Sequence, residues 1–295
     1  QSALGSRPCN AREARLIQPR ADRRKPIAPM GKYFHVLNIG LQNTFVYRWN
    51  FLLRCLFSFV PLLGTIFLWG AVFGDSQTEL AGYNYGKMIS YFVALILLDS
   101  ITSPTEDDFQ IAAEIRDGMI NQFLLKPVNY FVYRFCLFWS SRAVYTVVTL
   151  LPILGVVFFL RGYIVLPSSL DQWLLSAAAI FLSACLQFGI AYCTAMLAFW
   201  LLDISAPTFI VFSIEYALGG HMFPLDLMPR PLFELVRVLP FYYEYFFPLQ
   251  VFLGRASPQD ILHGFVLQIF WVIFFLVLGQ AVWRAGLRKY TAVGG

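Results

Sequence analysis

The chain has 295 residues, of which 58% are hydrophobic, 18% are aromatic and only 13% are charged. Soluble domains carry about 25% charged residues, so a chain this apolar could not cover its surface in water. The composition excludes an ordinary soluble protein and predicts an all-α polytopic membrane protein. The net charge of +5 comes from residues 1–30, which hold seven Lys or Arg and two acids.

The N-terminal stretch 1–29 is rich in Arg, Pro and Ala and has no apolar run. A signal peptide needs an apolar core of about 7–15 residues, so this stretch is not one. The first methionine, Met30, opens the run MGKYFHV, which resembles a natural start. We interpret residues 1–29 as an upstream extension, with a disordered basic tail touching anionic lipid as the alternative. Residues 30–295 are expected to form one transmembrane domain.

Residues 32–49 have the pattern of an amphipathic helix. Their apolar side chains fall on one helical stripe: Phe34, Leu37, Leu41, Phe45 and Trp49. Such a stripe predicts an interfacial helix that enters the membrane. A frayed cytoplasmic extension is the alternative.

Hydropathy and length predict six transmembrane helices of about 20 residues each. The spans are expected at about residues 51–73, 86–102, 137–160, 173–201, 207–221 and 261–283. Basic residues lie before the first span and after the last: Lys32, Arg48, Arg54, Arg284, Arg288 and Lys289. The positive-inside rule therefore places both ends in the cytoplasm, which requires an even number of spans.

A polar, helix-patterned segment, Phe109–Pro127, separates the second and third spans and should face the cytoplasm. Its apolar residues recur every three or four positions: Phe109, Ala112, Ile115, Met119, Ile120, Phe123 and Leu124. Pro127 has no backbone donor and disfavours helix in the residue before it, so one helix should end there. A short amphipathic helix in this place lies at the bilayer surface or docks on a soluble partner. A surface helix with no partner is the alternative.

The segment Met222–Asp260 is too long and too broken for one span. Five prolines punctuate its part up to Gly254: Pro224, Pro229, Pro231, Pro240 and Pro248. Non-helical backbone at membrane depth must be covered by protein or line a cavity. We expect broken, short helices that dip into the outer leaflet between spans five and six. A loop on the outer surface is the alternative.

Motifs for nucleotide, metal and catalytic sites are not found in the sequence. The run nearest to a P-loop, Gly82 to Met88, has the wrong spacing and no hydroxyl after its lysine. The three histidines are isolated and the five cysteines form no CxxC pair, so we predict no metal site and no disulfide framework. Neither a GxSxG nor an HExxH run is present, so no catalytic residue is predicted.

Three charged residues fall inside predicted spans: Asp99, Arg142 and Glu215. A charge at mid-bilayer is costly, so each is a functional candidate by default. We interpret Asp99 and Arg142 as near-interface residues or members of interhelical pairs. Glu215 lies deeper, six residues before His221, and is the best candidate for a pathway or inter-subunit polar contact.

Small and polar residues recur at helical spacing along the fourth span: Ser176, Ala179, Ser183, Gln187, Ala191, Thr194 and Ala198. Small residues let helices approach closely, and Gln187 can hydrogen-bond to a neighbouring helix. We interpret this stripe as helix packing, with a substrate path as the alternative.

Taken together, residues from Met30 to the C-terminus resemble the membrane subunit of a type-2 ATP-binding-cassette (ABC) transporter, in the exporter-like ABC-2 permease family. Residues 32–49 match the connecting helix of that family. The run Ile115-Arg-Asp-Gly-Met-Ile120 with Leu124-Leu-Lys-Pro127 resembles its R-x-G and L-L-[KR]-P segment. Gly219-Gly220, Phe223-Pro224 and Met228-Pro229 resemble its Gly/Pro pattern after span five.

The resemblance implies that Phe109–Lys126 is a coupling helix that docks on a separate cytoplasmic ABC ATPase. The residues implied in docking are Phe109, Ile115, Arg116, Asp117, Gly118, Phe123, Leu124, Lys126 and Pro127. ATP and Mg²⁺ would be bound by that partner, so this chain would be non-catalytic and need no cofactor of its own. The segment after His221 would cap the translocation path. The candidate pathway or inter-subunit residues are Glu215, His221, Gly220, Pro224 and Pro229.

The resemblance further implies a second permease copy or a related permease, and a bacterial cytoplasmic (inner) membrane with both termini in the cytoplasm. No nucleic-acid partner is expected. The alternative function is an ATP-independent channel or secondary transporter, although only one broken region is visible and intramembrane charges are few. An intramembrane lipid-modifying enzyme is disfavoured because no acid/base or metal cluster is present.

Overall fold

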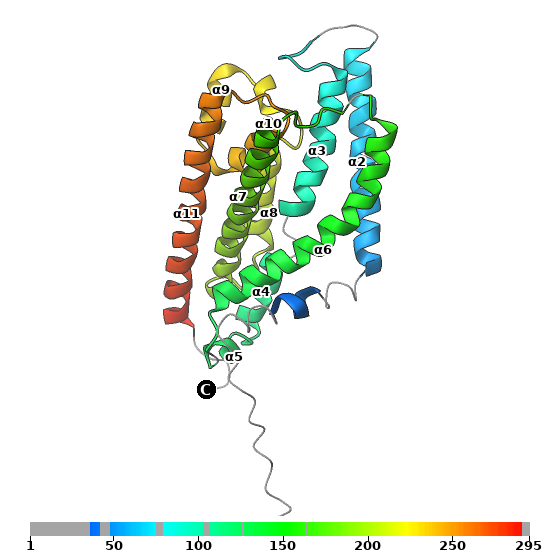
Figure 1. Ribbon diagram of the computed structural model, residues 1–295. Helices are drawn as coiled ribbons and strands as arrows, with labels where there is room; N and C mark the ends of the chain where they lie inside the picture. Colours follow the sequence, from blue (N-terminus) through cyan, green and yellow to red (C-terminus); the bar gives the residue numbers. More distant parts are fainter. Residues whose placement is uncertain are drawn as a thin grey trace, which may run out of the picture.

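The computed structural model describes residues 36–41, 48–74, 79–102, 107–125, 127–162 and 164–290, and within these ranges the protein is built from helices (Figure 1). A helical turn covers residues 36–41. The longer helices are α2 (Arg48–Phe73), α3 (Tyr85–Thr102), α6 (Tyr130–Phe159), α7 (Leu170–Ala195), α8 (Ser205–Leu218) and α11 (Pro258–Lys289). Shorter elements are α4 (Asp107–Arg116), α5 (Asn121–Leu124), η2 (Met196–Phe199), η3 (Leu225–Leu227), α9 (Arg230–Val236), η4 (Pro240–Tyr243) and α10 (Phe246–Phe252).

Three of the long helices, α6, α7 and α11, begin directly after an N-cap residue. The side chains of Asn129, Ser169 and Ser257 accept hydrogen bonds from backbone N–H groups in the first turns of α6, α7 and α11. These caps satisfy donors that have no partner inside the helix. Because capping is local chemistry, α6, α7 and α11 begin three to seven residues before the spans predicted from hydropathy alone.

Within the described residues, four helical stretches are long and apolar enough to cross a membrane, and they begin at Tyr85, Tyr130, Leu170 and Pro258. Val60–Phe73 and Ser205–Leu218 are shorter apolar helices. At 1.5 Å per residue, the 14 residues of α8 reach only about 21 Å, against about 30 Å for a hydrocarbon core. The all-α membrane fold is confirmed, while six spans remain a prediction. Most of the amphipathic helix predicted at 32–49 lies outside the described residues.

α7 lies at the centre of the fold, where it packs along α11 and also contacts α3, α4 and α10. Six of the seven stripe residues are buried: Ser176, Ala179, Ser183, Gln187, Ala191 and Thr194. Three of them, Gln187, Ala191 and Thr194, also line a cavity, so packing alone does not account for the whole stripe. A Cβ atom on Gly189 would lie 2.9 Å from the Phe275 side chain. The absence of a side chain at Gly189 therefore permits the close approach of α7 and α11.

The broken segment after α8 forms η3, α9, η4 and α10, so the predicted short helices are present. The alternative, a loop lying on the surface, is wrong for η4 and α10. Phe246, Leu249 and Val251 of α10 are buried, and Gln268 of α11 donates hydrogen bonds of 2.9 Å to the carbonyls of Ala179 and Tyr243. This segment fills the end of the bundle opposite α4 (Figure 1).

Candidate functional site

The segment between α3 and α6 is not the single helix that its periodicity predicts. α4 ends at Arg116, and Gly118 adopts a left-handed conformation with φ of +74° before α5 begins at Asn121. Glycine takes this conformation without the steric cost of a Cβ atom. The prediction of one helix through Pro127 is therefore wrong, because the turn at Gly118 changes the direction of the chain.

The turn also changes which residues are available to a partner. Ile115, one of the predicted docking residues, is buried, whereas Phe109 and Met119 are 43% and 46% exposed. Phe123 is half-buried and stacks against Tyr130 and Tyr133 of α6.

The outer face of the α4–α5 segment is charged and apolar. Arg116 and Asp117 pair at 3.2 Å with their side chains 54% exposed, and Leu125 is 88% exposed. Pro127 is also exposed. Lys126 and the Leu124 side chain lie outside the described residues.

Two buried arginines of α6 hold α4 in place. Arg142, with 1% of its side chain exposed, pairs with Asp107 at 2.9 Å. Arg134 pairs with Glu114, whose carboxylate also accepts a hydrogen bond of 2.8 Å from Tyr130. Asp107 begins α4 and Glu114 lies in its second half, so both ends of the helix are tied to α6. Glu114 is thus engaged within the chain and is not available to a partner.

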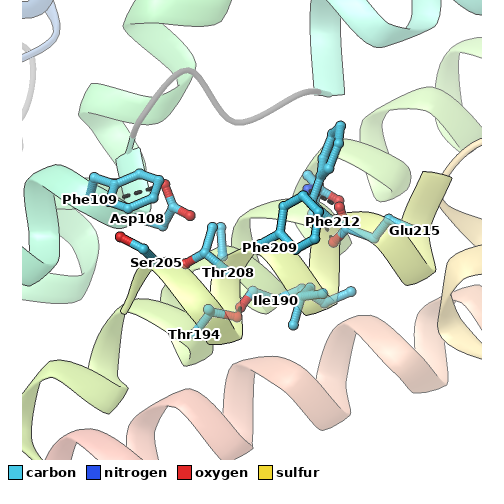
Figure 2. A pocket seen from close by; sticks show the side chains of 12 residues that line it. Asp108, Phe109, Ile190, Thr194, Ser205, Thr208, Phe209, Phe212 and Glu215 are labelled. Atoms are coloured by element: carbon cyan, nitrogen blue, oxygen red, sulfur yellow. Dashed lines mark hydrogen bonds between the residues drawn. The ribbon is translucent and has the colours of Figure 1, made fainter. Parts of the chain in front are cut away.

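A cavity of about 460 Å³ lies between α4, α7 and α8. Figure 2 shows Asp108 and Phe109 at one end, Glu215 at the other, and Phe209 and Phe212 between them. The lining residues are Asp108, Phe109, Gln187, Ile190, Ala191, Thr194, Ser205, Thr208, Phe209, Val211, Phe212 and Glu215. Glu215 therefore faces a cavity, as expected of a pathway residue, and Gln187 Nε2 lies 3.3 Å from its carboxylate.

The link that leads into α8 forms one edge of this cavity. Asp203 accepts hydrogen bonds from the backbone N–H of Ser205 at 2.9 Å and from its hydroxyl at 2.7 Å. Ser205 holds the pKa of the Asp203 carboxyl below its ordinary value, because both bonds favour the charged form. These bonds fix the start of α8 against the mouth of the cavity.

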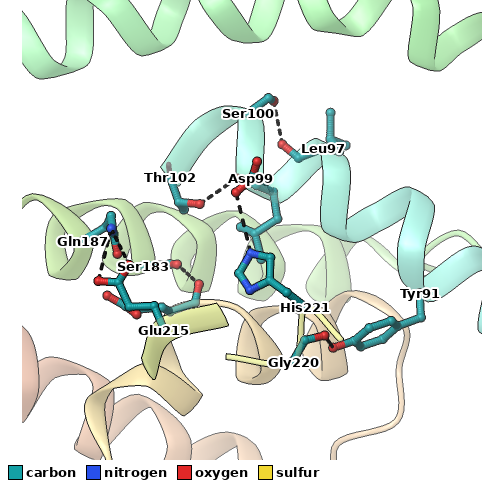
Figure 3. A network of polar contacts seen from close by, with 12 residues as sticks. Tyr91, Leu97, Asp99, Ser100, Thr102, Ser183, Gln187, Glu215, Gly220 and His221 are labelled. Atoms are coloured by element: carbon teal, nitrogen blue, oxygen red, sulfur yellow. Dashed lines mark hydrogen bonds and ion pairs between the residues drawn. The ribbon is translucent and has the colours of Figure 1, made fainter. Parts of the chain in front are cut away.

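The C-terminal end of α8 lies beside α3 (Figure 3). Tyr91 of α3 donates a hydrogen bond of 2.7 Å to the carbonyl of Gly220, and His221 Nε2 lies 3.7 Å from the Asp99 carboxylate. Gly220 has φ of +95°, and a Cβ atom there would lie 2.4 Å from the Tyr91 hydroxyl. The interpretation as a member of an interhelical pair is confirmed for Arg142, which pairs with Asp107 of α4, whereas Asp99 lies beside His221 in the turn after α8.

The depth of His221 differs from the prediction. We expected His221 at the outer end of span five, but its partner Asp99 is in the last turn of α3, near the predicted inner side. The physical reason is that α8 is short and Gly220 turns the chain, after which η4 and α10 occupy the space beyond. Pro224 precedes η3 and Pro229 precedes α9, and neither lines the cavity.

A family model described as ABC-2 family transporter protein matches residues 59–294. The chain belongs to the ABC-2 transporter family. It is an ABC-2 permease and a multi-pass membrane protein, as the resemblance in its sequence indicated. No curated protein matches the chain. Among the described residues of this permease, no three His, Cys, Asp or Glu side chains are grouped in a way that could hold a metal ion.

Several lining residues of the cavity had no recognisable signal in the sequence. Asp108 belongs to an acidic run of which Asp107 is the ion-paired member, and nothing in the run distinguishes the two. Phe209 and Phe212 are two of 30 phenylalanines. Glu215, as a charge within an apolar helix, identified this region in advance, and so did Gln187, Ala191 and Thr194 through the alternative reading of the small-residue stripe.

Proposed function

We propose that this ABC-2 permease is the non-catalytic membrane subunit of an ATP-driven exporter, and that a separate ATPase subunit docks on α4 and α5. The observation that carries the proposal is the construction of this segment. Its inner side is tied to α6 by the pairs Arg142–Asp107 and Arg134–Glu114. Its outer side leaves Arg116, Asp117 and Leu125 exposed.

Such a segment can transmit a displacement into the helices. Breaking a buried ion pair by separating its partners costs about 3–5 kcal/mol, so α4 and the base of α6 should move as one body. α4 also packs on α7 and η2. A push on the outer face of α4–α5 by an ATPase that closes around ATP would therefore reach α6 and α7 together.

The fold supports placing the first and last described helical segments on the same side of the membrane as the docking surface. The helical turn at 36–41, the α4–α5 segment and the C-terminal end of α11 lie at one end of the molecule (Figure 1). The positive-inside rule favours the cytoplasmic side for this end, and we infer a bacterial inner membrane from the resemblance. We infer six spans, with α2 and α8 as the first and fifth, and two permease chains paired with two ATPases.

The test is a pull-down of the full chain with its ATPase from the native membrane, read out as co-purified ATP hydrolysis. Leu125→Asp places a charge on the docking surface and should reduce the co-purified activity at least tenfold. Leu166→Asp is the control, because Leu166 is also exposed and lies in the link between α6 and α7, whose α7 side contacts α10 at the end opposite α4.

Loss of ATPase with Leu125→Asp alone would support the docking assignment. Equal retention by both variants would contradict it. An unmodified, well-folded chain that captures no ATPase would overturn the exporter proposal in favour of an ATP-independent channel or secondary transporter.

A further inference from the structure

The ionisable side chains that line the cavity between α4, α7 and α8 are all acidic. Two carboxylates line it, Asp108 and Glu215, and its described lining includes no Lys, Arg or His. Asp107, the neighbour of Asp108, is paired with Arg142 at 2.9 Å, whereas the Asp108 carboxylate accepts a bond of 2.9 Å from the Phe109 N–H. The cavity therefore has a carboxyl group at each end and no basic side chain in its described lining.

Buried polar atoms at the Glu215 end lack partners. Glu215 is 5% exposed, and the neighbouring Gln187, which is 1% exposed, has a side-chain oxygen with no hydrogen-bond partner in the described part of the chain. Glu244 is not in the lining of the cavity but lies close enough to Glu215 to interact with it; it is fully buried, and neither of its carboxylate oxygens has a described partner. Unpaired buried acceptors are costly unless a donor or a cation satisfies them.

The remaining walls are apolar and aromatic. Ile190 and Ala191 of α7 form part of the lining, and Phe109, Phe209 and Phe212 contribute aromatic rings. Aromatic faces attract organic cations through the ring quadrupole. A volume of about 460 Å³ suits a drug-sized ligand. An anionic or strongly hydrated sugar-like ligand fits this lining poorly.

We propose that this cavity binds the transported substrate and that the substrate is an organic cation with bulky apolar groups. The inference rests on the proposed function, since it names the substrate class of the same exporter. The cation would lie toward Glu215, with its apolar groups against the phenylalanines. Asp108 and Phe109 directly follow Asp107, the α4 residue tied to α6, so a displaced α4 would reshape the wall of the cavity.

The experiment measures equilibrium binding of tetraphenylphosphonium to the full chain in nanodiscs. Tetraphenylborate has the same shape and the opposite charge, so it separates charge recognition from size. We expect tetraphenylphosphonium to bind at least tenfold more tightly than tetraphenylborate. Glu215→Gln should weaken tetraphenylphosphonium binding at least tenfold, and Asp108→Asn about threefold.

Two exposed acids outside the cavity provide matched controls. Glu234→Gln and Asp171→Asn remove the same charges from exposed positions and should leave binding unchanged. Comparison with Glu215→Gln in the same nanodiscs subtracts partition of the probe into lipid. Ala191→Leu fills the cavity without changing charge and should also abolish binding, which keeps the test decisive if Glu215→Gln folds poorly.

Equal binding of the two probes, or affinity unchanged in both Glu215→Gln and Ala191→Leu, would overturn the assignment. ATPase capture by the same preparations is read separately. If the chain captures its ATPase but does not discriminate the probes, the result supports the exporter proposal and contradicts this substrate class. If the chain discriminates the probes but captures no ATPase, the result supports the cation site and contradicts the proposal of an ATP-driven exporter.

Discussion

The two ends of this permease hold their non-spanning segments by different interactions. At one end, α4 is tied to α6 by two ion pairs of buried arginines, Arg142–Asp107 and Arg134–Glu114. At the other end, η4 and α10 are held by close aromatic and aliphatic packing and by the uncharged amide of Gln268. Both segments are short and irregular, yet only the first is anchored through buried arginines, because the ion pairs at the second end, Arg237–Asp260 and Arg255–Asp226, join more exposed side chains.

The difference indicates how each end responds to force. A charge pair concentrates its energy in two side chains, so moving one partner carries the other or breaks the contact at a large cost. A packed segment spreads its energy over many small contacts and resists changes of volume instead. The first construction suits a segment that receives a push, and the second suits a segment that stays in place.

The largest effect is expected from breaking one ion pair. Arg142→Met removes the cation and leaves the Asp107 carboxylate uncompensated, which should lower the free energy of unfolding by about 3–5 kcal/mol. Arg142→Met combined with Asp107→Leu removes both charges and should recover most of that stability. Thermal unfolding in nanodiscs measures both variants. A double variant as unstable as the single one would show that Arg142 acts through its ring contact with Phe138 rather than through charge.

An intermediate effect is expected from overpacking the other end. A Cβ atom on Gly264 of α11 would lie 2.0 Å from the ring of Phe247 in α10. Gly264→Ala should therefore cost about 1–3 kcal/mol of unfolding free energy. Gly155→Ala in α6 is the control, since a Cβ atom there meets nothing within 4 Å, and it should stabilise by up to about 1 kcal/mol. Similar melting temperatures for the two variants would refute tight packing at α10.

The smallest change in unfolding free energy is expected where an arginine is replaced by lysine, which tests whether α4 is held by the geometry of the guanidinium or by its charge alone. Arg134 Nε donates a bond of 3.1 Å to Tyr130 while its guanidinium pairs with Glu114. Lysine keeps the charge but cannot make both contacts in this geometry, so Arg134→Lys should cost about 1 kcal/mol. Arg116→Lys changes an exposed pair and should have no measurable effect on unfolding. Equal melting of the two variants would show that charge alone holds α4.

The sequence predicted the long helices well, because each buries or exposes a continuous apolar stretch that hydropathy detects. α3, expected at 86–102, spans Tyr85–Thr102. The break at Gly118 was missed because the apolar periodicity continues through it, while the left-handed φ that redirects the chain leaves no trace in that pattern. A glycine in such a run is ambiguous until its dihedral angles are known.

The candidate site was only partly predictable. Glu215 was identified because a charge inside an apolar helix is costly and invites an explanation. Its cavity was not, because the walls come from α4, α7 and α8, and their meeting depends on the ion pairs that dock α4. The depth of His221 was also missed, since hydropathy reports how apolar a segment is and not where it ends in the bundle.

The shortness of α8 has an electrostatic consequence. Helix carbonyls sum to a partial charge of about −0.5 at a C-terminus, and the end of α8 lies beside the body of α3, where Tyr91 and Asp99 contact Gly220 and His221. Backbone dipoles thus make the interior of the bundle negative without help from any ionised side chain. Acidification that neutralised the carboxylates would leave this backbone field in place.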